Sequence, residues 1–197
     1  MPRLPLLSLT LPIVLVMAGC SRQSADEAQQ RETAAAPAAQ ASESDAEALN
    51  GMIDRSHAGQ PLPKVTVSGA NGVKLDVATL KGPLLINLWA TWCAPCVAEM
   101  PKLDQLAREP GTPRILAVSE DPKGAEVVNP FLAEHQFLNL QMWLDPETNL
   151  TYALGGANLP ITVLYDADGK EVWRMVGGYD WSSDKAKALV AEASAKA

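Results

Sequence analysis

The two side chains with the clearest capacity for chemistry are Cys93 and Cys96, which enclose only Ala94 and Pro95. They stand where an apolar run, 83–89, gives way to apolar residues at helical spacing. The amino-terminal end of a helix carries about half a positive charge and unpaired N–H groups, which stabilise a thiolate. A lowered pKa makes Cys93 a nucleophile near neutral pH, with Cys96 close enough to form a disulfide. This pattern favours a redox-active pair.

The residues alone leave other uses of this pair open. A structural zinc site needs two further ligands, and the chain offers only His57, His135 and the distant Cys20. A permanent structural disulfide across so short a loop would constrain little of the unfolded chain. We therefore expect no metal and no other cofactor, and we place both histidines at the surface.

The amino-terminal residues 1–19 have the pattern of a secretory signal peptide. Arg3 supplies a positive charge, an apolar run covers 4–18, and small residues close the segment. The run is shorter than the roughly 20 apolar residues of a membrane span, and Pro5 and Pro12 interrupt it. These features predict an exported protein.

The end of this segment, Met17-Ala-Gly-Cys20, resembles the lipobox of bacterial lipoproteins. The resemblance implies that Cys20 is lipidated and anchors the protein to a membrane. Ser21 follows rather than an acidic residue, and its resemblance to enterobacterial sorting signals implies sorting to the outer membrane. Residues 20–58 contain no aromatic residue and are rich in Ala, Gln, Glu and Ser, so we expect a flexible tether.

Residues 59–197 are expected to form one folded domain. The net charge of the chain is -7 and its Lys and Arg residues do not cluster, which argues against a nucleic-acid partner. The patterns predict an α/β sandwich that contains both parallel and antiparallel strand pairs. Strands are expected at 64–68, 73–76, 83–89, 114–118, 140–144, 161–165 and 171–175, and helices at 94–108, 125–135, 151–154 and after 182.

The string Leu88-Trp-Ala-Thr-Trp-Cys-Ala-Pro-Cys-Val-Ala-Glu-Met-Pro101, followed by Leu159-Pro-Ile-Thr162 and Asp166-Ala-Asp-Gly169, resembles the TlpA/ResA-type thioredoxins. These are exported, membrane-tethered relatives of thioredoxin. The resemblance covers nearly everything after the tether. It implies a thioredoxin-like fold, with a mixed central sheet flanked by helices and an N-terminal β-hairpin extension.

The resemblance also implies roles for individual residues. Cys93 would attack a disulfide and Cys96 would resolve the intermediate. Pro160 would form a cis peptide bond, and Leu159 before it would present its backbone to a substrate strand. Trp92 would shield the disulfide and contact partners.

Thioredoxin itself has a buried aspartate beneath its cysteines, and Asn87 occupies the matching position here. The TlpA/ResA group shares this loss and carries a glutamate on the active-site helix, where this chain has Glu99. Because Glu99 lies three residues after Cys96, the two share a helix face. A partly buried carboxylate there would have a raised pKa and could exchange protons with the cysteines.

The implied function is disulfide exchange with thiols or disulfides of exported proteins, in the bacterial cell envelope facing the periplasm. Relatives usually act as reductants, for example on apocytochrome c or copper-site cysteines, and a membrane electron carrier recharges them. A copper-handling module that uses Cys93 and Cys96 is the alternative. A peroxide-reducing enzyme of the same broad fold is disfavoured, because its cysteine stands in a different motif.

Overall fold

The structure is a computed structural model that describes residues 49–156 and 158–194. The predicted signal peptide 1–19, the predicted lipidation site Cys20 and most of the predicted tether lie outside the described residues. Within the described ranges, no helix combines the length and the hydropathy that crossing a membrane requires.

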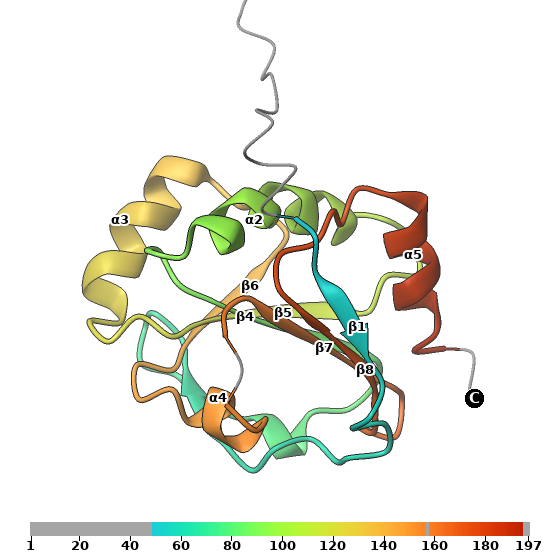
Figure 1. Ribbon diagram of the computed structural model, residues 1–197. Helices are drawn as coiled ribbons and strands as arrows, with labels where there is room; N and C mark the ends of the chain where they lie inside the picture. The colour runs from blue at the N-terminus through green and yellow to red at the C-terminus, as the bar shows by residue number, and fades with distance from the viewer. Residues whose placement is uncertain (1–48, 157, 195–197) are drawn as a thin grey trace, which may run out of the picture. The chain divides into compact units, whose positions relative to one another are not determined.

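A single eight-stranded sheet runs through the described part of the chain, in the order β1-β8-β7-β4-β5-β6-β2-β3 (Figure 1). β4 pairs in parallel with β5, and β5 with β6, whereas β7 is antiparallel to both β4 and β8. The sheet is therefore mixed, as predicted. The middle strands are β4 (Leu84–Trp89), β5 (Arg114–Ser119), β6 (Gln141–Leu144), β7 (Ile161–Tyr165) and β8 (Glu171–Val176).

All six residues of β4 are buried, which is what a nearly continuous apolar run at the centre of a covered sheet requires. Its side chains alternate between two hydrophobic clusters. Leu84, Ile86 and Leu88 belong to one cluster, and Leu85 and Trp89 belong to the other. The two clusters lie on opposite faces of the sheet, because successive side chains of a strand point to opposite faces.

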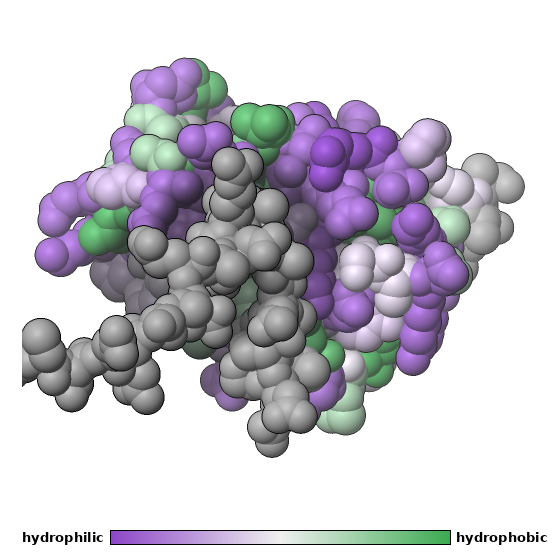
Figure 2. Space-filling view, turned by 90° about the horizontal axis from the view of Figure 1, so that it is seen from above, coloured by the Kyte–Doolittle hydropathy of each residue, from purple (hydrophilic) through white to green (hydrophobic). Residues whose placement is uncertain are grey.

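Longer helices cover one face of the sheet and shorter elements cover the other (Figure 1). The first set is α2 (Ala94–Leu106), α3 (Ala125–His135) and α5 (Asp184–Ala191), and the second is α4 (Asn149–Ala153) and the 3-10 helix η1 (Val77–Thr79). The outer surface above α2, α3 and α5 is mainly hydrophilic where it is coloured, with hydrophobic residues in small separate groups (Figure 2). A hydrophilic outer face is typical of amphipathic helices, which pack their apolar face on a sheet.

The hairpin extension predicted before the central strands is present. β2 (Thr66–Ser68) and β3 (Lys74–Asp76) pair antiparallel, and Ser68 of β2 pairs with Leu144 at the end of β6. Gly72 lies in the connecting turn with φ of 81°, in the left-handed region that glycine adopts without strain.

β1 (Met52–Asp54) differs from expectation, because it lies inside the segment 20–58 that was assigned to the tether. It pairs antiparallel with β8, with Ile53 opposite Met175. Arg55 also donates two hydrogen bonds to the Glu192 carboxylate, at 2.7 and 2.9 Å. Regular structure is thus present before residue 59. Main-chain pairing and the packing of Ile53 alone against the core hold this short edge strand, and neither leaves a hydrophobic pattern in the sequence.

Candidate active site

Several chain segments meet at one end of the sheet. Leu88 of β4 lies opposite Ile161, the first residue of the antiparallel β7, so the loop after β4 and the loop before β7 emerge together. The parallel strands β5 and β6 also end there, because Ser119 pairs with both Trp89 and Leu144. In open α/β sheets the carboxyl ends of the strands are the usual place for a functional site.

Cys93 and Cys96 form a disulfide at the amino-terminal end of α2. Cys93 is the N-cap residue of the helix, and its sulfur accepts a hydrogen bond from the Cys96 N–H at 3.3 Å. Cys93 is 6% exposed and Cys96 is fully buried. The more accessible sulfur is thus also the one toward which a helix N–H points, an arrangement that stabilises a thiolate.

The peptide bond between Leu159 and Pro160 is cis, as the resemblance implied. Only about 5–6% of X–Pro bonds in folded proteins are cis, so composition alone would not have predicted it. Leu159 is half-buried, and its main-chain N–H and C=O make no hydrogen bond to other described residues. The backbone of Leu159 can therefore pair with an added strand.

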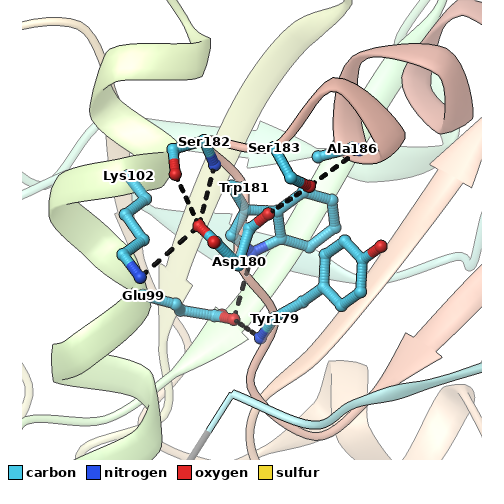
Figure 3. Close-up of polar contacts among 8 residues, drawn as sticks. All are labelled: Glu99, Lys102, Tyr179, Asp180, Trp181, Ser182, Ser183 and Ala186. Carbon is cyan, nitrogen blue, oxygen red and sulfur yellow. Dashed lines mark hydrogen bonds and ion pairs between the residues drawn. The ribbon is translucent and has the colours of Figure 1, made fainter. Parts of the chain in front are cut away.

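Glu99 is fully buried on α2 and accepts three hydrogen bonds. Oε1 accepts from Asn87 Nδ2 at 2.8 Å, and Oε2 accepts from the Tyr179 N–H at 2.8 Å and from Trp181 Nε1 at 3.0 Å. The loop of 179–183 thus folds back onto α2, and an ion pair of 3.4 Å between Lys102 and Asp180 adds to this contact (Figure 3).

Burial raises the pKa of Glu99 to about 7, and the three hydrogen bonds oppose this rise only in part. A carboxyl group with such a pKa changes its protonation state near neutral pH. Burial and a raised pKa are what the sequence led us to expect, and the burial is more complete than expected. The Glu99 carboxyl group can therefore release or take up a proton on the buried side of α2, the helix that begins at the disulfide.

Asn87 occupies the middle of β4 and is fully buried. Its Nδ2 donates to Glu99 and also to Thr162 Oγ1, at 2.9 Å. Its Oδ1 has no hydrogen-bond partner among the described residues. The amide therefore links the central strand to the buried carboxylate without carrying a charge of its own.

A groove of about 340 Å³ lies beside the disulfide loop and the cis-proline loop. Trp92, which is 67% exposed, and Leu159 both line it, so the two residues expected to contact a substrate lie side by side in one groove. Glu120 and Tyr152 line it as well, and the sequence analysis missed both. Position in the chain could have indicated Glu120, because it directly follows the buried strand β5 at the end of the sheet where β4 also ends.

Comparison with known proteins identifies the family. The model of the AhpC/TSA family matches residues 58–173. The chain belongs to this family. Within it, the chain is 34% identical over 125 residues to the thiol-disulfide oxidoreductase ResA of a Bacillus cereus strain, covering 60% of this chain and 69% of that protein.

A second relative from the curated proteins is the thiol:disulfide interchange protein DsbE of Pseudomonas fluorescens biotype C. It is 36% identical over 144 residues, which cover 68% of this chain and 79% of that protein. Among solved structures, the exposed lipoprotein thioredoxin of Streptococcus pneumoniae strain TIGR4 is 25% identical with a TM-score of 0.53, over 65% of this chain and 98% of that one. The chain is thus a TlpA/ResA-type thioredoxin-like thiol–disulfide oxidoreductase, which confirms the resemblance found in the sequence.

Proposed function

We propose that this oxidoreductase reduces disulfides in exported proteins, with Cys93 as the attacking residue. The observation that carries this assignment is the hydrogen bond from the Cys96 N–H to the Cys93 sulfur at the start of α2. The Cys93 thiolate attacks one sulfur of the substrate disulfide, forms a mixed disulfide with it and releases the other sulfur as a thiolate.

Cys96 completes the reaction. Its thiolate attacks the Cys93 sulfur, breaks the mixed disulfide and releases the second substrate sulfur as a thiolate. Two electrons have then passed from the cysteine pair to the substrate, and the pair has become the disulfide seen in the structure. A membrane electron carrier returns two electrons and regenerates the dithiol.

Glu99 serves this cycle as a proton donor and acceptor. Because its pKa is raised to about 7, it exchanges a proton at neutral pH without a large free-energy cost. The substrate pairs as an extended strand with the backbone of Leu159, next to Pro160, and it packs against Trp92. Apocytochrome c and copper-site proteins, whose cysteines must be reduced before assembly, are the substrates we propose.

The protein works at a bacterial membrane, facing the periplasm. A signal peptide at 1–19 directs export, lipidated Cys20 anchors the chain, and the tether after it lets the domain reach its partners. The similarity to a lipoprotein of Streptococcus pneumoniae supports this arrangement. Growth with labelled palmitate tests it, because the wild type should carry label and Cys20→Ser should not.

Covalent trapping tests the division of roles. Cys96→Ser should accumulate mixed disulfides between Cys93 and its substrates, because no thiol remains to resolve them, and mass spectrometry of the captured proteins names them. Cys93→Ser is the matched control and should trap few proteins, since the buried Cys96 is left. Equal trapping by both variants would show the role assignment to be wrong. The reduction potential of the pair decides whether it acts as donor or acceptor.

A further inference from the structure

The groove beside the disulfide loop exposes two aromatic rings. Trp92 is 67% exposed and Tyr152 is 75% exposed, whereas most large hydrophobic side chains among the described residues are buried. Both rings line the same groove, together with Leu159. Trp92 directly precedes the attacking cysteine, and Leu159 directly precedes the cis-proline. Exposed aromatic rings at such a place are typical of a contact surface for a partner.

A carboxylate lies at the base of this groove. Glu120 lines it although its residue is only 3% exposed. The main-chain N–H of Thr151 donates to Oε1 at 3.2 Å, and the Thr151 hydroxyl donates to Oε2. Glu120 forms no ion pair with a Lys, Arg or His in the part of the chain that the structure describes. Two carboxylate oxygens can accept about four hydrogen bonds, so part of the accepting capacity remains free.

Two further carboxylates lie at the same end of the sheet. Asp121 and Asp145 are each 2% exposed, and they follow β5 and β6. Their hydrogen-bond donors are uncharged: Thr91 and Ser119 for Asp121, and Leu150 and Asn149 for Asp145. Neither forms an ion pair with a described Lys, Arg or His. Glu120, Asp121 and Asp145 therefore bring acidic groups to the groove and its surroundings that no ion pair among the described residues offsets, although burial and the nearby Asp145 raise the pKa of Glu120.

We infer that the groove binds a Lys or Arg side chain of the substrate polypeptide, close in sequence to the substrate's disulfide. The aliphatic stem and the cation lie against the rings of Trp92 and Tyr152, and the charged end donates to the Glu120 carboxylate. Aromatic faces attract cations, and a hydrogen bond between charged groups is stronger than one between neutral groups. This inference rests on the proposed function, for which it names the class of substrate sequence.

Disulfide peptides that differ at one position test the inference. Three sets of peptides, otherwise identical, carry Lys, Gln or Glu at each position within three residues of the cysteine, and the reduced protein reacts with each. For at least one of these positions, the peptide with Lys should react about fivefold faster than the peptide with Gln. The peptide with Glu at that position should react more slowly than both. The ratio of the Lys rate to the Gln rate is the measurement, so any general change in reactivity cancels.

Three variants connect the ratio to the groove. In Glu120→Gln the ratio should fall to near one, because the carboxylate is lost while the side-chain size is kept. Tyr152→Leu should lower the ratio as well, and this side chain is exposed, so its loss leaves the core intact. Glu109→Gln removes the same charge at a carboxylate that pairs with Lys187 outside the groove, and it should keep the wild-type ratio.

Equal rates for the three peptides at every position would overturn the inference and leave disulfide exchange intact. If no peptide reacted at all, the proposed function would fail. The groove is then tested separately by titrating the oxidised protein with cysteine-free peptides while the Trp92 indole N–H resonance is followed. A shift larger with the Lys peptide than with the Glu peptide supports the inference, and equal or absent shifts refute it.

Discussion

Asn87 and Glu99 form a hydrogen bond of 2.8 Å in the protein interior, and neither side chain is exposed to solvent. In this arrangement the amide nitrogen donates to an ionised carboxylate, while Asn87 Oδ1 has no partner among the described residues. If the amide turns over, Oδ1 faces Glu99 and accepts the proton of the neutral acid. An asparagine can therefore satisfy both protonation states, which an aspartate at the same position could not do without adding a second charge.

Glu99→Gln should remove one step from the pH dependence of thiol reactivity. In the wild type the carboxyl group titrates near pH 7, so the alkylation rate of Cys93 in the reduced protein should change slope there. The amide of the variant does not titrate, so only the slope due to the thiols should remain. Rates measured from about pH 5 to pH 9 show the difference. Glu109→Gln is a charge-matched control at a partly exposed carboxylate outside the site, and it should behave as the wild type does. An unchanged profile in Glu99→Gln would refute the proton-exchange role.

Glu99 should also make stability depend on pH. In the folded protein this group keeps its proton up to about pH 7, whereas the unfolded chain loses it near the ordinary value of 4.5. Between these values the folded state binds more protons, so the free energy of unfolding falls as the pH rises. The fall is on the order of 3 kcal/mol and ends above about pH 7.

Urea unfolding of the oxidised protein at several pH values measures this effect. From about pH 5 to pH 7 the unfolding free energy of the wild type should fall relative to that of Glu99→Gln. Above about pH 7 the difference between the two proteins should stay constant. A difference that does not vary with pH would mean that the Glu99 carboxyl titrates at its ordinary value.

Asn87→Asp should place two carboxyl groups in hydrogen-bond contact in the interior. Both cannot ionise there without a large cost, so they should share a proton and the pKa of the pair should rise. We expect the variant to be destabilised by about 3 kcal/mol at pH 8, where the second proton is lost, and by much less at pH 5. Unfolding measured at both pH values checks this, and equal destabilisation at the two would contradict it.

The sequence was sufficient to predict the elements whose patterns are local. The apolar run at 83–89 indicated the central strand, and the cysteine spacing with its flanking residues indicated both the family and the active-site helix. Burial of Glu99 followed from its helix face and from the resemblance. Each of these signals lies within a few residues of the feature that it predicts.

Other features could not be predicted because their causes lie far apart in the chain. Glu99 accepts hydrogen bonds from Tyr179 and Trp181, 80 and 82 residues away, and these donors stand in a loop with no periodic pattern. β1 is a three-residue edge strand that pairs with β8 through its backbone, and only its Ile53 packs against the hydrophobic core. Backbone hydrogen bonds are available to every residue type, so they leave little trace in the sequence.

The ion pair of Arg174 and Glu171 is the buried charge pair whose loss should cost the most. Arg174 Nε and Nη2 each lie 2.7 Å from a Glu171 carboxylate oxygen, and Nη1 donates to the Leu154 carbonyl at 2.6 Å. The two side chains are only 6% and 1% exposed. Arg174→Met should lower the free energy of unfolding by about 3–5 kcal/mol, because it leaves the Glu171 charge buried and unpaired.

The ion pair of Arg55 and Glu192 is the comparison for the buried pair. Its nitrogen–oxygen distances of 2.7 and 2.9 Å are similar, but its side chains are 49% and 34% exposed. Arg55→Met should cost less than about 1 kcal/mol, since water already screens both charges. In the double variant Glu171→Gln, Arg174→Met the loss should be smaller than in Arg174→Met alone, because no charge remains in the interior. Urea unfolding of the three variants measures how much free energy of unfolding each one loses. If Arg174→Met lost no more than Arg55→Met, the unpaired Glu171 carboxylate would have avoided the cost of burial by protonation or by contact with water.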